Sequence, residues 1–167
     1  MDPAQTKISF TLGATAHTVH GRFSLTKGEL SFDPGSGRVE GEIVIDARSG
    51  NTDNDGRDSK MHKDVLESAN FPEIVFRPDR AEGFSAASGT LSGTVHGEFV
   101  IHGNHHEMSV PVSVQFAAER WNASAKFTVP YVDWGLKNPS TFLLRVSKTV
   151  DVDVETSGSL KNLAAPD

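Results

Sequence analysis

Residues 23–45 read FSLTKGELSFDPGSGRVEGEIVI, and they decide the fold class because the register across their turns can be tested. Pro34-Gly35-Ser36-Gly37 has the composition of a four-residue loop. With that loop, Phe32 lies opposite Val39, and an acidic and a basic residue face each other beside the turn. A register shifted by one residue would place phenylalanine against serine. The pairing therefore predicts an antiparallel meander with one apolar face.

A second turn is predicted upstream, at Lys27-Gly28, from its residue types. A two-residue turn there places Leu25 opposite Leu30 and Phe23 opposite Phe32. Apolar side chains then meet again on one face of the sheet.

The longest predicted hairpin turns at Gly103-Asn104. In that register Ile101 opposes His106 and Phe99 opposes Met108. Arms of about twelve residues are long for a sandwich and favour a strongly curved sheet or a barrel.

One stretch departs from this pattern of strands and turns. Met61, Val65 and Leu66 have the i, i+4, i+5 spacing of a helix with one apolar stripe. The Asp and Asn residues at positions 53–55 are N-cap candidates, so we expect one short helix near residues 55–68. Such a helix is too short to be stable alone and must dock on the strands.

The remaining alternating stretches complete the strand count. We expect Arg77-Pro78-Asp79 to end one strand and residues 80–89 to form a loop or a weak edge. The last strand is expected to run from Leu144 to Val154, and the polar tail from Ser157 to fray. Closure removes the free edges of so many strands, so the sequence predicts an all-β, antiparallel, lipocalin-like barrel of about eight strands with one short inserted helix.

Four glycines, at positions 21, 41, 93 and 97, fall on the apolar face of their strands. Glycine within a strand leaves no side chain to pack, so one interpretation is an unfilled interior with room for a small ligand. The other interpretation is that these glycines relieve crowding or allow the sheet to curve sharply. The sequence leaves both open.

Composition limits the classes of function. The chain of 167 residues, 37% of them apolar, is most simply one domain spanning 1–167. A net charge of −6, without a cluster of lysine and arginine, argues against a nucleic-acid surface. No apolar stretch reaches the roughly 18 residues that span a bilayer.

The first residues, MDPAQTK, do not form a signal peptide, so a cytoplasmic location stays open. The absence of cysteine excludes disulfides and thiolate chemistry.

Seven histidines raise two enzymatic alternatives. His17 and His20 point to opposite faces of a strand, and His102 with His105 supplies fewer ligands than a dedicated zinc site needs. No GxSxG sequence marks a hydrolase nucleophile. We therefore predict no metal, no cofactor and no catalytic residue, and keep a hydrolytic or metal-dependent enzyme that uses the histidines as the alternative.

The chain resembles the YceI-like family, a lipocalin-like group that binds polyisoprenoids and other long apolar chains. The resemblance runs nearly end to end and rests on the order and spacing of its pieces. Arg57-Asp58 opens the expected helix, and Phe71-Pro72-Glu73-Ile74-Val75-Phe76 follows it. The other matching pieces are Ile8-Ser9-Phe10, Val19-His20-Gly21-Arg22-Phe23, Gly28-Glu29-Leu30-Ser31-Phe32-Asp33, Gly97-Glu98-Phe99-Val100-Ile101-His102-Gly103 and Asp133-Trp134-Gly135-Leu136.

This resemblance implies an extended barrel with the helix beside its mouth, an elongated apolar tunnel, a periplasmic or secreted location, and dimers as a common state. Many members carry an arginine shortly before the late Asp-aromatic-Gly, where this chain has Pro130-Tyr131. We therefore predict noncovalent binding, storage or transport of a long-chain apolar lipid: a polyisoprenoid, an isoprenoid quinone, or a fatty acid or amide. A packed barrel acting as a stress-related interaction protein is the second alternative.

The predicted ligand contacts are mostly apolar, with two basic residues near a polar end. Arg57 is placed at the mouth beside a head group, although a structural role in the helix entry is the interpretation that we favour. Lys148 interrupts the apolar face of the last strand and is placed at the rim. The predicted apolar lining consists of Phe10, Phe23, Phe32, Val39, Ile43, Phe76, Phe99, Met108, Val110, Phe127, Trp134 and Phe142.

Overall fold

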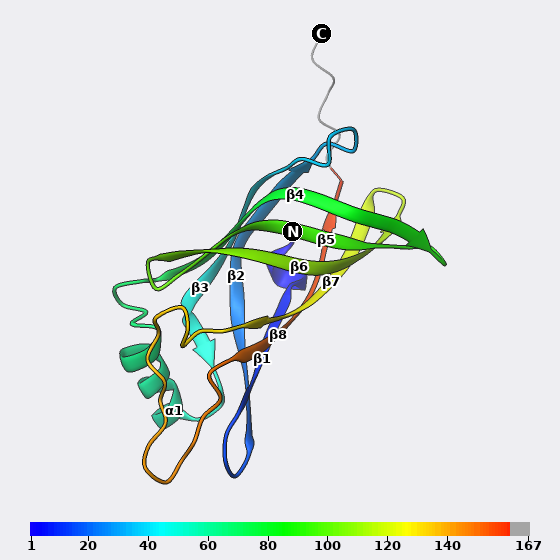
Figure 1. Cartoon of the computed structure of the whole chain (residues 1–167). Helices are drawn as coiled ribbons and strands as arrows, with labels where there is room; N and C mark the ends of the chain where they lie inside the picture. The colour runs from blue at the N-terminus through cyan, green and yellow to red at the C-terminus, as the bar shows by residue number, and fades with distance from the viewer. Residues whose placement is uncertain (161–167) are drawn as a thin grey trace.

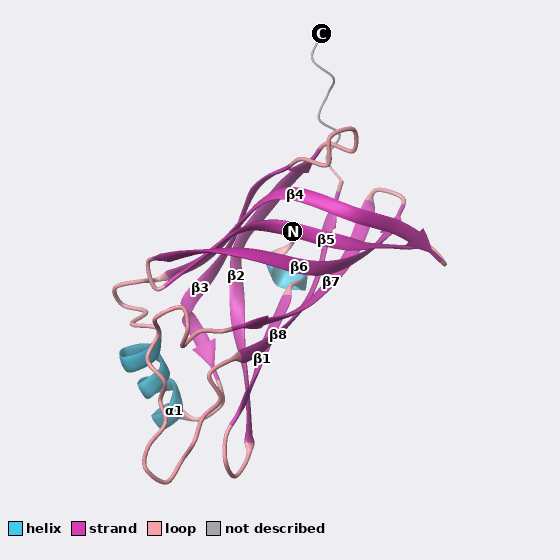
Figure 2. Ribbon diagram, viewed as in Figure 1, coloured by secondary structure: helices cyan, strands magenta, loops and turns pink. Residues whose placement is uncertain are grey.

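The computed structural model describes residues 1–160 and shows a closed antiparallel barrel in which each strand pairs with the next and β1 pairs with β8 (Figures 1 and 2). The predicted all-β barrel of about eight strands is confirmed. The strands are β1 (Lys7–Gly13), β2 (Thr18–Phe32), β3 (Val39–Asn51), β4 (Glu73–Ala87), β5 (Thr90–Ile101), β6 (Asn104–Ala117), β7 (Arg120–Val129) and β8 (Val150–Ser159). The helical elements are η1 (Pro3–Gln5), α1 (Asp55–Lys60) and η2 (Met61–Val65), the last a π-helical turn.

The predicted four-residue loop between β2 and β3 is confirmed. Phe32 pairs with Val39, and the Asp33 backbone N–H donates to the carbonyl of Arg38 at 2.9 Å. The second predicted turn, Lys27-Gly28, is wrong because β2 runs straight through it with a bulge between Leu25 and Lys27. A bulge accommodates one extra residue and bends the strand. The sequence pattern of a bulge therefore resembles that of a turn.

Gly28 has a different role from the one expected. A Cβ atom at this position would lie 2.6 Å from Sδ of Met1. The N-terminal ammonium of Met1 donates to the Gly28 carbonyl at 2.7 Å, and η1 continues from there to the start of β1. Glycine therefore admits the first residues of the chain against β2.

The long β5–β6 hairpin turns at His102-Gly103, one residue before the predicted turn. Both residues have positive φ, 52° and 72°, as a type I′ turn requires. Phe99 consequently pairs with His106 and Gly97 with Met108, a shift of two residues from the prediction. Because side chains alternate with a period of two, the shift leaves every side chain on its predicted face.

The predicted ending of β4 at Arg77-Pro78-Asp79 is also wrong. The strand continues to Ala87, and the register slips between Pro78 and Arg80. Proline has no N–H to donate, and a bulge accommodates it within the sheet. The stretch expected to be a loop, 80–89, is mostly strand up to the turn at Ser88-Gly89.

The last strand begins later and ends later than predicted. Residues 144–149 lie outside any strand apart from an isolated bridge between Ala14 and Val146, and β8 starts at Val150. The predicted fraying from Ser157 is wrong for residues 157–159, since Ser157 is buried and pairs with Asn122. The rest of that predicted tail, residues 161–167, lies outside the described residues.

The inward glycines do not leave empty space beside them. A Cβ on Gly21 would lie 2.2 Å from the ring of Phe10, its cross-strand partner, and one on Gly93 would lie 2.3 Å from the ring of Phe84. At Gly97 the obstacle is backbone, since the Arg77 carbonyl oxygen would be 2.3 Å away. Crowding, the second interpretation of these glycines, is therefore the correct one.

The helical insert closes one end of the barrel. The Asn54 side chain caps α1 by accepting from the Arg57 backbone N–H at 2.9 Å. His62 fastens the helix to the sheet through the Gly50 carbonyl at 2.8 Å and to the following turn through the Ser68 hydroxyl at 3.0 Å. The main buried cluster lies at this end and comprises Ala47, Leu66, Ile74, Phe99, Ile101, Val129, Tyr131 and Leu136.

Candidate functional site

The barrel interior is the candidate binding site, and its wall is apolar in the middle of the strands. Register places one continuous set of side chains inward on every strand from β1 to β8. Many of these side chains are only half-buried, although strands enclose them on both sides. Side chains that meet in a filled core are fully buried, so this set is packed less completely than such a core. We call it the inner row: Phe23, Ile43, Phe76, Val95, Met108, Val112, Ala125, Phe127, Val152 and Val154.

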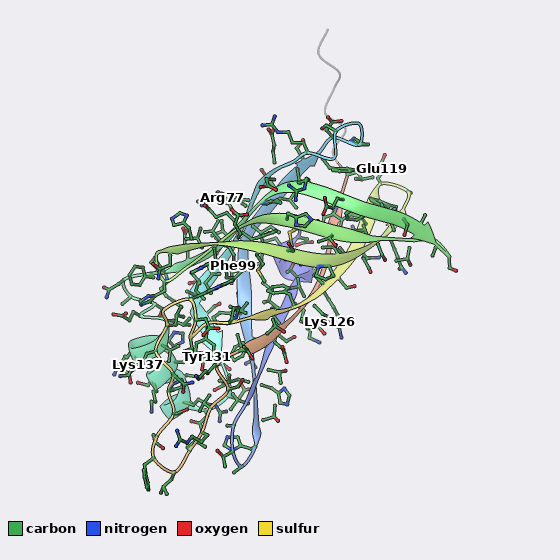
Figure 3. All side chains as sticks on the ribbon, viewed as in Figure 1. Arg77, Phe99, Glu119, Lys126, Tyr131 and Lys137 are labelled. Atoms are coloured by element: carbon green, nitrogen blue, oxygen red, sulfur yellow. The ribbon has the colours of Figure 1, made fainter. Side chains whose placement is uncertain are left out.

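The two ends of the barrel differ. At the helix end, Leu66, Tyr131 and Leu136 are buried and close the interior with the loop that follows β7. At the other end, Phe32 and Phe116 face inward by register but are 52% and 54% exposed. Figure 3 labels Phe99 and Tyr131 toward the helix end and Glu119 at the opposite end. The apolar face is thus sealed at one end and open to solvent at the other.

Ten predicted lining residues lie on the inward face, but they fall into three groups. Phe10, Val39, Phe99 and Val110 are fully buried and form part of the wall. Phe32 lies at the open end. The five that belong to the inner row are Phe23, Ile43, Phe76, Met108 and Phe127.

Phe142 and Lys148 are not where the sequence predicted. Phe142 is 94% exposed on a loop tip, and Lys148 is exposed in the segment before β8. For Lys148 the cause is that the predicted alternation from residue 144 onward assumed a strand, and β8 begins only at Val150.

Arg57 is engaged within its own loop. Its Nε donates to the Thr52 hydroxyl at 2.8 Å and its Nη2 to the Thr52 carbonyl at 2.9 Å. The Thr52 hydroxyl in turn donates to Asp58 at 2.5 Å, and the Thr52 backbone N–H donates to the same carboxylate at 2.9 Å. Arg22 makes a bidentate pair with Asp53, both contacts at 2.9 Å, and this arginine lowers the pKa of the Asp53 carboxyl. These contacts order the entry to α1, which is the structural role favoured from the sequence.

Trp134 lies in the loop after β7 rather than on a strand. There it contacts a histidine that faces inward. Its ring stacks on His106 with centroids 4.2 Å apart and planes 3° from parallel, and it lies 5.5 Å from the ring of Phe99. The Nε2 atom of His106 is buried and has no hydrogen-bond partner among the described residues. The register predicted from the sequence places His106 opposite Ile101 in the long hairpin and does not identify this feature. The available signal was its alternation with Met108 and Val110 on the apolar face.

A polar hollow of about 410 Å³ is lined mainly by residues of β6, β7, β8 and the N-terminal segment. Its lining includes Ser113, Ser124, Glu155 and Lys7, which pair in that order across β6, β7, β8 and β1. These four residues alternate with the inward positions, whereas Ala123 and Thr156, which also line the hollow, share the inward parity.

Several ion pairs connect neighbouring strands on the outer face of the barrel. Lys27 pairs with Glu42 at 2.6 Å, and Arg77 links Glu42 to Glu98 at 3.5 and 3.4 Å. The His105 hydrogen bond is the main cause of the lowered pKa of the Glu98 carboxyl. These pairs are solvent-exposed, and each contributes little stability.

Several histidines are occupied structurally. His102 contacts Glu67 at 2.5 Å and packs against Phe71 with ring centroids 4.4 Å apart, which joins the β5–β6 turn to the helical insert. His96 bridges Ser109 and Glu82, both at 2.7 Å. Within residues 1–160, no group of three or more His, Cys, Asp or Glu side chains is placed to hold a metal ion. In the same range, no helix has both the length and the apolar character needed to cross a bilayer.

A family model for the YceI-like domain matches residues 1–157. This chain belongs to the YceI-like family. The match covers all eight strands except the end of β8, and the resemblance drawn from the motifs is thereby confirmed. A search of curated proteins finds no significant relative.

Solved structures share the fold at low sequence identity. BcnA of Burkholderia cenocepacia matches with a TM-score of 0.76 and 17% identity, over 95% of this chain and 99% of that one. A polyisoprenoid-binding domain from Saccharophagus degradans, implicated in plant cell wall breakdown, matches with a TM-score of 0.69 and 18% identity, over 93% and 94% of the two chains. The Campylobacter jejuni YceI protein matches with a TM-score of 0.70 and 17% identity, over 89% and 88%.

Proposed function

We propose that this protein binds a long-chain apolar lipid, noncovalently, inside the barrel. The observation that carries the proposal is the inner row, which is apolar, enclosed by strands and yet only half-buried. An apolar surface that a closed wall holds away from bulk water is suited to an apolar guest. The Saccharophagus relative, which is described as binding a polyisoprenoid, supports an isoprenoid chain as the class of lipid.

The driving force is the transfer of ligand carbon from water to the inner row. Each buried methylene contributes about 0.8 kcal/mol, so roughly fifteen carbons supply a gross gain of about 12 kcal/mol. Loss of translational and chain freedom offsets part of this gain. Tight binding therefore needs no charged contact with the ligand. The wall is preformed, which reduces the cost of ordering the protein on binding.

The open end supplies the entry route in this proposal. Phe32 and Phe116 carry the apolar face out to solvent, whereas Leu66, Tyr131 and Leu136 close the helix end. The ligand chain therefore enters between the β2–β3 and β6–β7 hairpins, and its leading end reaches the region of Phe99. A periplasmic or secreted carrier that stores or transfers the lipid, alone or as a dimer, is the finer form of the proposal.

The contacts of the histidines support binding over catalysis. His62, His96, His102 and His105 each hold a hydrogen bond or ion pair that fastens one element to another. A catalytic imidazole needs a free nitrogen directed at a substrate together with a partner that orients its ring. The contacts of these four histidines therefore give the enzymatic alternative no support.

Native mass spectrometry of the purified protein tests the proposal. After incubation with an isoprenoid alcohol such as geranylgeraniol, we expect a one-to-one adduct that survives gentle ionisation and dissociates at higher collision energy. A stoichiometric metal adduct would support the enzymatic alternative. No adduct with isoprenoid alcohols, isoprenoid quinones or fatty amides would favour the packed barrel and refute the carrier.

A further inference from the structure

The interior contains one polar atom without a partner. Nε2 of His106 is the buried side-chain nitrogen or oxygen that lacks a hydrogen bond within the described part of the chain. The buried polar residues behave differently. Thr52, Ser68 and Thr156 bond to Asp58, His62 and Thr6 respectively. A buried polar atom without a partner costs about 1–3 kcal/mol, so the position of His106 requires an explanation.

The imidazole is held rigidly in place. His106 lies on β6 opposite Phe99 of β5, and its other face stacks on Trp134. The loop that carries Trp134 is fixed by backbone bonds, with the Trp134 N–H donating to the Pro130 carbonyl at 3.1 Å. Asn104, at the start of β6, donates from Nδ2 to the Trp134 carbonyl at 3.5 Å. A fixed ring with an unused nitrogen amid apolar groups is a preorganised contact for one oxygen atom.

The surroundings restrict what that oxygen belongs to. A phosphate or diphosphate requires several charged donors, and no lysine or arginine within residues 1–160 is buried. The position of the family's arginine, noted from the sequence, is occupied by Pro130-Tyr131, and Tyr131 is buried with its hydroxyl donating to the Ser147 carbonyl at 2.6 Å. A single imidazole suits a neutral carbonyl, amide or hydroxyl oxygen.

We propose that His106 Nε2 is the hydrogen-bonding contact for a neutral, oxygen-bearing end group of the bound lipid, and that Trp134 positions the imidazole. This inference rests on the proposed function and adds the chemistry of the ligand's polar end. The ligand is then an isoprenoid quinone, alcohol or fatty amide whose head reaches the helix end of the barrel and whose tail lies along the inner row.

The test compares three probes that share one chain: geranylgeraniol, the corresponding hydrocarbon without oxygen, and geranylgeranyl diphosphate. Dissociation constants are measured by displacement of a fluorescent fatty-acid probe. One hydrogen bond contributes about 0.5–1.5 kcal/mol, so His106→Phe should lower the ratio of alcohol to hydrocarbon affinity by about 2- to 12-fold. Phenylalanine keeps the stacking surface for Trp134, and the hydrocarbon should still bind. His106→Gln, which retains a donor, should recover part of the ratio.

Glu107→Gln is the matched control, since Glu107 is the next residue on β6, faces outward by register and is exposed. It should leave the ratio unchanged. An unchanged ratio in His106→Phe, with both probes still binding, overturns this inference and leaves the carrier function standing. Tightest binding of the diphosphate by the wild-type protein also overturns it. If the wild-type protein binds none of the three probes, the proposed function fails as well.

A different observation carries a second proposal, at the tip of the loop between β7 and β8. Phe142 and Leu143 are 94% and 85% exposed. They occupy the centre of a tight turn in which the Thr141 N–H donates to the Leu144 carbonyl at 2.8 Å and the Leu144 N–H to the Thr141 hydroxyl at 3.1 Å. Two adjacent large apolar side chains on an ordered turn indicate an interaction site.

The base of this tip is fixed and basic. Arg145 and Thr15 exchange backbone and hydroxyl bonds of 2.8–3.2 Å, which tie the tip to the β1–β2 loop. Lys60 of α1 donates to the Pro139 carbonyl at 3.2 Å, and the loop runs beside α1 in Figure 1. Arg145 and Lys148 form no ion pair within residues 1–160. Apolar residues flanked by free cations match the interface of an anionic bilayer.

We infer that Phe142 and Leu143 insert into the surface of a membrane that contains anionic lipid. Flotation with phosphatidylcholine vesicles, with and without phosphatidylglycerol, tests this inference. The wild-type protein should float with the anionic vesicles, and the double variant Phe142→Ser/Leu143→Ser should not. Arg145→Gln should weaken binding about fivefold, because each basic residue near the surface contributes about 1 kcal/mol.

Phe116→Ser at the opposite end of the barrel is the matched control and should float like the wild type. Equal flotation of the double variant overturns the inference. A wild-type protein that stays in solution with both kinds of vesicle also overturns it. If the tip instead joins two copies of the chain, size-exclusion chromatography should show a dimer that the double variant does not form. Retention of geranylgeraniol binding by the double variant separates this result from that of the carrier function.

Discussion

Replacing Ala125 with phenylalanine distinguishes an empty interior from a filled one. Ala125 lies on β7 between Val112 of β6 and Val154 of β8, faces inward by register, and is half-buried. In a filled core, the added ring would overpack the site and destabilise the fold by about 1–3 kcal/mol. Beside an unfilled space, the ring can enter and bury its own apolar surface, which contributes up to about 1.5–3 kcal/mol. A loss of stability in Ala125→Phe therefore indicates a filled interior, and a gain indicates an unfilled one.

The same ring should compete with the ligand. If it displaces roughly three methylenes, each contributing about 0.8 kcal/mol, affinity falls by about 2.4 kcal/mol, or about 60-fold. For a chain of 167 residues, 1 kcal/mol corresponds to about 2–4 °C in the midpoint of thermal unfolding. We therefore expect an unchanged or higher midpoint together with weaker binding of geranylgeraniol.

Thermal unfolding followed by circular dichroism and displacement of a fluorescent lipid probe measure the two effects. Ser124→Phe is the matched control, because Ser124 is the adjacent residue on β7 and faces outward. It should leave lipid affinity unchanged. A midpoint that falls by several degrees in Ala125→Phe, with lipid affinity unaffected, would mean that the interior beside Ala125 is filled and does not bind the lipid.

Three further predictions concern single positions. Burial raises the pKa of Tyr131, the chain's one tyrosine, from 10.0 to about 12, so its stabilising contribution is complete below pH 10 and is lost as pH rises through about 12; absorbance at 295 nm should show no tyrosinate near pH 10 until the protein unfolds. Asn54→Ala removes the cap that accepts from Arg57 and should cost about 1 kcal/mol in urea denaturation, whereas no change would mean that the cap is dispensable. Gly97→Ala meets backbone and should cost about 1–3 kcal/mol, and Gly21→Ala should cost less because the ring that it meets can rotate; equal costs would contradict this difference.

Periodicity predicted the parts of the fold that depend on which side chains face inward. The pairing of Phe32 with Val39 and the inward direction of Phe99 and Met108 follow from a period of two, which survives a register error of two residues. The number of strands predicted closure of the barrel, and the family resemblance added the position of the helix beside its mouth. Many residues together determine these features, so a wrong assignment at one residue does not change them.

Features that depend on one backbone conformation were not predictable in the same way. A glycine in a turn and a glycine that admits another chain segment look alike, and Gly28 is the second kind because Met1 packs against it. Pro78 signals the end of a strand unless a bulge accommodates it. The alternation after Leu144 resembled a strand, although the strand starts only at Val150.

The candidate site likewise has features that the sequence predicted and features that it did not. The apolar wall followed from alternation, whereas the unpartnered nitrogen of His106 depends on the loop that lays Trp134 on its ring. The exposure of Phe142 likewise depends on the turn between Thr141 and Leu144. Contacts between segments far apart in sequence decide both features, and no local pattern encodes them.

In the proposed function, the inner row borders a space that an apolar chain fills. The most direct measurement is the electron density between the walls of the barrel in crystals grown with geranylgeraniol. We expect continuous, chain-shaped density that contacts Phe23, Ala125 and Phe127 and ends within hydrogen-bond distance of His106 Nε2. Side chains from opposite walls in van der Waals contact, with no density between them, would contradict the proposed function.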